Sequence, residues 1–123
     1  MKYNQRLKQD IEKYKDYVII VEGKKDASAL KALGFERVYE IHATSLSLRE
    51  RTEQIASELN KKDKVCILMD FDKKGKKLYS TIKPIFQELG VKLDSSFRGL
   101  LIRARVSHIE GLNTFIKNID KII

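Results

Sequence analysis

A run of five apolar residues, most of them β-branched, occupies positions 17–21 and leads directly into a charged segment. A second apolar run, at 65–69, also ends in charged residues. Strands that are apolar on both faces are typical of parallel sheets covered by helices on both sides. The two runs therefore predict an α/β fold in which charged residues follow two neighbouring buried strands.

The remaining apolar residues alternate between helical and strand spacing. Helices are expected over 1–15, 27–33, 47–59, 78–89 and 111–123, and further strands over 37–41 and 100–102. Gly34 and Gly90 stand where helices end. Pro84 should kink its helix or split it into two. This alternation predicts one domain over 1–123, with a mainly parallel four-stranded central sheet and helices on both faces.

A capping box is predicted at the start of the third helix, where Ser47 and Glu50 have the required spacing. The chain has 123 residues, which is enough for one domain with its own core. Its hydrophobic content of 42% excludes a disordered chain. The single cysteine, Cys66, excludes an internal disulfide and a cysteine-based zinc site, and its apolar surroundings predict that it is buried.

The charge balance favours polyanionic partners. Lysine and arginine total 25 against 17 aspartates and glutamates, for a net charge of +8. A domain this basic favours nucleic acid, although plain solubility or the lysine- and glutamate-rich surface of a hyperthermophile gives the same balance. No apolar stretch approaches the ~20 residues of a membrane span, and no membrane partner is expected. A cytoplasmic location is therefore predicted.

Three carboxylates follow the two buried strands. Asp70 and Asp72 are two residues apart and share a face of extended backbone, and Glu22 follows the neighbouring strand at the same edge. Carboxylates this close repel one another unless a cation lies between them. Mg²⁺ takes oxygen ligands and keeps several waters, which phosphate oxygens can replace. The alternative is that the aspartates only cap a helix or form local turns.

Lysines crowd beside these acids. They are Lys24, Lys25, Lys73, Lys74, Lys76 and Lys77. Their charges suit a phosphate chain that approaches a metal, and a metal held in this way supports in-line phosphoryl transfer. His42 and His108 are isolated histidines without ligand spacing, and a structural role is expected for both.

The segments Val18–Asp26 and Leu68–Gly75, in this order and separation, resemble the two motifs of the Toprim domain. The resemblance extends from about residue 17 to residue 112. It implies a Rossmann-like sheet and magnesium bound by Glu22, Asp70 and Asp72. It also implies that Glu22 acts as general acid or base in strand cleavage or joining.

Further site residues follow from the same resemblance. Thr44 and Ser45 match a polar turn that contacts phosphate, and Asp26 is a further acidic candidate. The late segment Val106–Leu112 is similar to one shared by the 5S ribosomal RNA maturase and small archaeal Toprim-only proteins; primases also contain Toprim domains. Within this segment Glu110 is either another acidic group of the site or a glutamate favoured by a helix N-terminus.

The leading hypothesis is a magnesium-dependent enzyme of phosphodiester chemistry, a nuclease that acts on structured RNA rather than DNA. The alternative is a non-catalytic module that binds magnesium and nucleic acid within a larger complex. Because the accessory RNA-binding region of the maturase is absent from these residues, substrate is expected to bind the lysines or a protein partner that supplies recognition. A phosphorylation-dependent receiver domain is disfavoured, because its acidic pair after the first strand is reduced here to Glu22.

Overall fold

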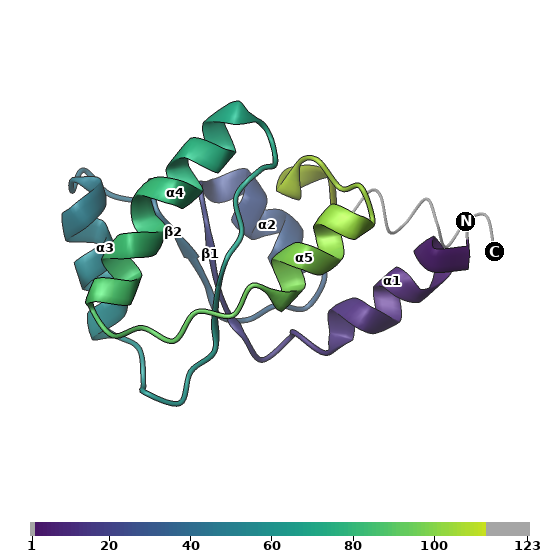
Figure 1. The fold of residues 1–123 in the computed structure, drawn as a ribbon, viewed down its shortest axis with the longest axis horizontal. Coiled ribbons are helices and arrows are strands. Elements are labelled where there is room, and N and C mark those ends of the chain that lie inside the picture. Colours follow the sequence, from purple (N-terminus) through teal and green to yellow (C-terminus); the bar gives the residue numbers. More distant parts are fainter. Residues whose placement is uncertain (1, 113–123) are drawn as a thin grey trace.

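The computed structural model describes residues 2–112, drawn in colour in Figure 1. Helices and strands alternate over residues 2–88, as predicted from the apolar spacing. In order, the elements are α1 (Lys2–Glu12), β1 (Val18–Val21), α2 (Lys24–Ala32), β2 (Val38–Glu40), α3 (Leu48–Ser57), β3 (Val65–Ile67), α4 (Lys73–Glu88), α5 (Ser96–Arg103) and the short 3₁₀ helix η1 (Ile109–Gly111).

The sheet is parallel, with strand order β2-β1-β3. Ile19 in the central strand pairs with Val38 of β2 on one side and with Cys66 of β3 on the other. All four residues of β1 are buried. The continuous apolar run at 17–21 therefore forms the central strand, as a strand covered on both faces should.

Side chains of β1 alternate between two hydrophobic clusters, one on each face of the sheet. Ile19 and Val21 pack into the cluster formed with α1, α2 and α5. Val18 and Ile20 pack into the cluster formed with α3 and α4. Figure 1 shows these two groups of helices on opposite sides of the strands. The chain thus leaves β1 toward one face and β3 toward the other, so the carboxyl ends of these two strands are the topological switch point of the sheet.

The predicted fourth strand is wrong, because residues 100–102 lie within α5. A short apolar triplet fits either element, but the fully buried positions Phe97 and Leu101 are four residues apart, which is helical spacing. Beyond β3 the described residues add only one isolated parallel bridge, between Val65 and Leu93. The sheet of the described chain therefore has three strands.

Helix α4 is longer than expected and is not split. It begins at Lys73, and Pro84 lies inside one continuous helix of 16 residues. Leu78, Ile82 and Phe86 are buried on both sides of the proline. This packing offsets the hydrogen bond that proline removes.

Several local predictions are confirmed. Gly34 and Gly90 adopt φ of +100° and +78° at helix ends, Ser47 and Glu50 form a capping box, and Cys66 is buried. Residues 113–123 of the predicted final helix lie outside the described part of the chain. Among the described helices, none has the length and apolar character needed to span a membrane.

Candidate functional site

The carboxyl ends of β1 and β3 are followed by the predicted acidic residues. Glu22 follows β1 directly, and Asp70 and Asp72 lie in the loop between β3 and α4. Leu68 continues the sheet past β3, because its N–H donates to the carbonyl of Ile20 at 2.8 Å. The loop therefore leaves β3 beside the end of β1, where ligands of open α/β sheets bind.

The Asp72 side chain caps the N-terminus of α4, and this cap requires a glycine at position 75. The Asp72 Oδ1 atom accepts a hydrogen bond from the Gly75 N–H at 2.8 Å. A Cβ atom at position 75 would lie 2.0 Å from the carbonyl oxygen of Asp70. Only glycine fits here, since real Cβ atoms do not approach backbone oxygen so closely. The helix-capping alternative for Asp72 is therefore realised, and the cap also fixes the direction of its carboxylate.

Asp70 connects the loop to a segment far along the chain. Its Oδ1 atom accepts a hydrogen bond from the Ile109 N–H at 2.8 Å, and the Phe71 N–H donates to the carbonyl of Ser107 at 3.0 Å. These two bonds hold residues 107–109 against the acidic loop. His108 is thereby placed between the two bonds, beside the aspartates.

Asp70, Asp72 and His108 form a group that can hold a metal ion. One ligand atom of each lies within 4.8 Å of the others, and His108 Nε2 is 3.7 Å from Asp72 Oδ2. Because the backbone hydrogen bonds use one oxygen of each aspartate, the second oxygens remain for a cation. Two carboxylates and an open side toward solvent fit a hard divalent ion that keeps waters, and the imidazole adds a nitrogen ligand.

Glu22 lies beside this group but is held differently. Its side chain is 20% exposed, and Oε2 is 3.2 Å from Nζ of Lys74 and 3.7 Å from Nε2 of His42. Glu22 does not belong to the group within 4.8 Å. Its role as a metal ligand remains a prediction.

Asp26 and Glu110 lie in the same electrostatic neighbourhood. Burial raises the pKa of Asp26 above its ordinary value, a backbone hydrogen bond from Gly23 opposes this, and repulsion from Asp70, Glu22 and Glu110 adds to it. Glu110 is exposed in the first turn of η1. The region thus gathers more negative charge than the three predicted ligands alone.

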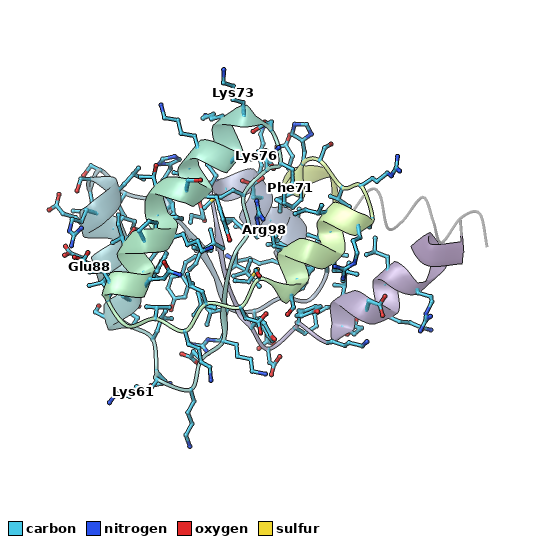
Figure 2. All side chains as sticks on the ribbon, viewed as in Figure 1. Lys61, Phe71, Lys73, Lys76, Glu88 and Arg98 are labelled. Atoms are coloured by element: carbon cyan, nitrogen blue, oxygen red, sulfur yellow. The ribbon has the colours of Figure 1, made fainter. Side chains whose placement is uncertain are left out.

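The predicted phosphate-binding residues lie at the surface, and one of them, Lys74, contacts the Glu22 carboxylate. All of the lysines predicted for this role are exposed: Lys24, Lys25, Lys73, Lys74, Lys76 and Lys77. Figure 2 shows Lys73 at the end of α4 nearest the acidic loop. Thr44 and Ser45 are exposed in the loop after β2, where Thr44 Oγ1 accepts from the Leu46 N–H at 3.2 Å.

Sequence reasoning missed the two histidines. The side chains of His42 and His108 are 50% and 55% exposed, and each lies beside a carboxylate of the site. A structural role was expected because neither has a second ligand at a fixed spacing. The one available signal was position: His42 follows β2, and His108 stands in the late segment of the resemblance.

Comparison with known proteins gives consistent matches. The family model described as the Toprim domain matches residues 17–109. A UPF0292 protein of Methanosarcina barkeri is 35% identical over 83% of this chain and 71% of its own length. Ribonuclease M5 of Mesoplasma florum is 37% identical, but over 53% of this chain and 37% of its own length. A solved structure of an Aquifex aeolicus protein matches with a TM-score of 0.68 and 28% identity, covering 89% of this chain and 94% of that one.

Proposed function

The chain belongs to the Toprim domain family, and from this membership we propose that it is a magnesium-dependent nuclease that acts on structured RNA. The observation that carries the proposal is the convergence of Asp70, Asp72 and His108 within 4.8 Å, with Glu22 alongside and exposed lysines around them. The partial similarity to a ribonuclease supports RNA as the substrate.

In this proposal Asp70, Asp72 and Glu22 hold Mg²⁺, which would stabilise charge on the phosphate and lower the pKa of a bound water. The lysines bind the flanking phosphates. Glu22 also takes or returns a proton during cleavage, for which Lys74 and His42 position its carboxylate. General acid–base catalysis needs such a side chain within reach of the attacking or leaving oxygen.

A magnesium titration followed by amide NMR tests the metal site. We expect weak binding, since few carboxylates and several waters share the ion, with shifts at Glu22, Gly23, Asp70 and Asp72. The double variant Asp70→Asn, Asp72→Asn should lose the response. It should keep the fold, because asparagine preserves both acceptor oxygens used in the backbone hydrogen bonds. Shifts confined to α1 or α3 would contradict the assignment.

Cleavage profiling tests the activity. A pool of structured RNAs and DNAs is incubated with wild type and with the double variant, in magnesium and in chelator. We expect cleavage of RNA by wild type in magnesium only. Activity that survives in chelator or in the double variant would contradict the proposal.

A second candidate function is a non-catalytic module that binds magnesium and nucleic acid in a larger complex. The partial match to Ribonuclease M5, which spans 37% of that protein, favours this alternative. A protein partner would then supply substrate recognition. Magnesium and RNA binding without cleavage across the whole pool would support the module over the enzyme.

A further inference from the structure

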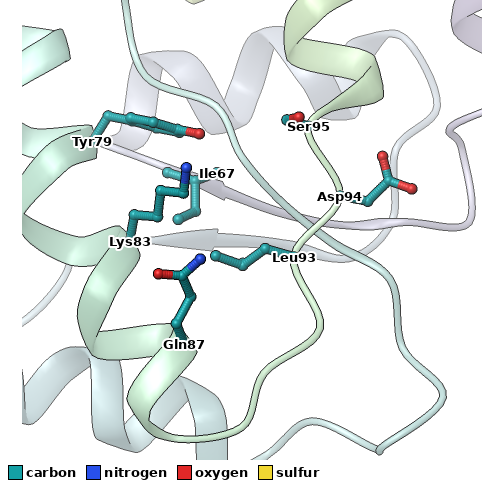
Figure 3. Close-up of a pocket in the computed structure, with 7 residues that line it drawn as sticks. All are labelled: Ile67, Tyr79, Lys83, Gln87, Leu93, Asp94 and Ser95. Atoms are coloured by element: carbon teal, nitrogen blue, oxygen red, sulfur yellow. The ribbon is translucent and has the colours of Figure 1, made fainter.

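A cavity of about 190 Å³ lies away from the acidic loop, between α4 and the segment before α5. It is lined by Ile67, Tyr79, Lys83, Gln87, Leu93, Asp94 and Ser95. Figure 3 shows the α4 side chains on one side of the cavity and residues 93–95 on the other. The volume is below the roughly 300–1,000 Å³ of sites for drug-sized ligands, which suits a single planar ring system.

A continuous stripe of α4 connects this cavity with the acidic loop. Asp72, Lys76, Tyr79, Lys83 and Gln87 follow one another at steps of three or four residues, so they share one face of the helix. From Asp72 to Tyr79 the helix rises about 10 Å. A strand whose phosphate lies at the carboxylates therefore reaches the cavity within a few nucleotides.

Arg98 links the two places from the α5 side. Its guanidinium carbon lies 4.0 Å from the ring centroid of Tyr79 and 5.4 Å from that of Phe71, and Figure 2 shows Arg98 between α4 and α5. Its Nε atom is buried and has no hydrogen-bond partner within the described chain. Two aromatic contacts, rather than hydrogen bonds from this nitrogen, hold the side chain.

The chemistry of the cavity fits an unpaired nucleobase. Tyr79 supplies an aromatic surface, and two cations lie over its ring, the Arg98 guanidinium carbon at 4.0 Å and Lys83 Nζ at 5.5 Å from the centroid. The Lys83 ammonium, on a flexible stem, is the group that a base would displace. The Asp94 carboxylate is engaged by the Tyr17 hydroxyl and the Ser96 N–H at 3.1 and 2.8 Å. Its oxygens are thus hydrogen-bonded within the protein, and Lys83 supplies the cation of the cavity lining that suits a polyanion.

We propose that this cavity binds an unpaired base of the substrate strand, which stacks on the Tyr79 ring in place of the Lys83 ammonium while the adjoining phosphates follow the α4 stripe to the acidic loop. The inference rests on the proposed function and narrows its substrate class. The enzyme acts where a single-stranded segment of RNA flanks the cleaved bond. Single-stranded bases are the parts of RNA that proteins stack on aromatic and arginine side chains.

The test is binding in chelator, so that cleavage does not interfere. The probes are a single-stranded RNA containing one 2-aminopurine and the blunt duplex of the same sequence. We expect 2-aminopurine quenching with wild type and with Tyr79→Phe, which keeps the ring. Tyr79→Leu should lose the quenching and bind the single strand about tenfold more weakly, with unchanged affinity for the duplex. Lys83→Gln should weaken single-strand binding more than the matched Lys61→Gln at the far end of the molecule.

Unchanged single-strand affinity in Tyr79→Leu overturns the inference, as does an equal loss for strand and duplex. A free nucleoside monophosphate that binds as tightly as the strand also overturns it. If Tyr79→Leu does not fold, wild type is cross-linked to RNA containing 4-thiouridine, and cross-links at residues 76–87 support the inference while cross-links only elsewhere overturn it. If wild type and Tyr79→Leu cleave RNA equally well in magnesium, this inference is overturned but the proposed function stands. If wild type binds no nucleic acid, the proposed function is overturned as well.

Discussion

The carboxylates after β3 are held by backbone amides, whereas the carboxylate after β1 is held by side chains. Asp70 and Asp72 each accept a 2.8 Å hydrogen bond from a main-chain N–H. Glu22 instead contacts Lys74 and His42 at 3.2 and 3.7 Å. Long side chains at the surface exchange partners easily, and an exposed ion pair contributes little energy. The aspartates are thus suited to hold a metal ion in a fixed position, and Glu22 is suited to act as a general acid or base.

Glu22→Gln should produce the largest effect. Glutamine keeps the shape and the hydrogen bonding of the side chain but cannot take a proton, so RNA cleavage should fall ~100- to 10,000-fold. RNA affinity in the same magnesium buffer should change little. Glu36→Gln is the control, because it removes one exposed carboxylate that precedes β2 and lies outside the site. Equal cleavage rates for wild type and Glu22→Gln would assign the activity to another base or to a contaminant.

Glycines next to the two sets of acids give the second test. Gly75→Ala places a Cβ atom 2.0 Å from the Asp70 carbonyl oxygen, whereas a Cβ atom at Gly23 meets nothing within 4 Å. Gly75→Ala should lower the free energy of unfolding by about 1–3 kcal/mol or more. Gly23→Ala should change it by less than about 0.5 kcal/mol, since a poorer cap offsets a less flexible unfolded chain.

Urea denaturation of both glycine variants measures the difference. The same variants also test the geometry of the metal site. Magnesium-induced amide shifts at Asp70 and Asp72 should be weaker in Gly75→Ala but not in Gly23→Ala. Equal losses of stability in the two variants would mean that the β3 loop is no more rigid than the β1 loop.

The lysines of the two regions should differ in how strongly they affect nucleic-acid binding. The triple variant Lys73→Gln, Lys76→Gln, Lys77→Gln leaves Lys74 beside Glu22 and removes three charges from α4. Each lost phosphate contact lowers the slope of log affinity against log salt by ~0.7–0.9, so the slope should fall by about two units. Lys24→Gln with Lys25→Gln should lower it by less.

RNA binding at several salt concentrations gives these slopes. The control is Lys61→Gln with Lys62→Gln, in the exposed loop after α3, which should leave the slope unchanged. If the control and the α4 triple variant have equal slopes, the nucleic acid contacts another surface, for example the segment with Arg103 and Arg105.

Asp26 gives the smallest effect, in the pH dependence of stability. Burial raises its pKa in the folded protein above the ordinary 3.8. The unfolded chain therefore releases this proton first as the pH rises, and the free energy of unfolding falls between 3.8 and the folded pKa. Asp26→Asn should remove that fall. Denaturation of magnesium-free protein across this pH window tests it, and identical pH profiles would contradict the assigned shift.

The sequence predicted what depends on local pattern. The buried runs at 17–21 and 65–69 form neighbouring parallel strands, and the acids that follow them lie at the same edge of the sheet. The capping box of Ser47 formed because its two hydrogen bonds join residues three apart. The strand predicted at 100–102 is wrong because three apolar residues do not distinguish a strand from one side of a helix.

What the sequence did not predict depends on distant contacts. His108 joins the aspartates only because residues 107–109 are tied to the loop after β3 by two hydrogen bonds across the fold. No spacing near His108 encodes that contact. The contacts of Arg98 also could not be predicted from local spacing, because its aromatic neighbours Phe71 and Tyr79 lie in other parts of the chain.

The hydrogen bond between the Ile109 N–H and Asp70 has a consequence for how the protein is made. The two residues are 39 positions apart, so Asp70 emerges from the ribosome well before its partner. A nascent chain can pair β1, β2 and β3 while residues 107–109 are still inside the exit tunnel. The acidic loop therefore cannot acquire its final arrangement until residues 107–109 have left the ribosome.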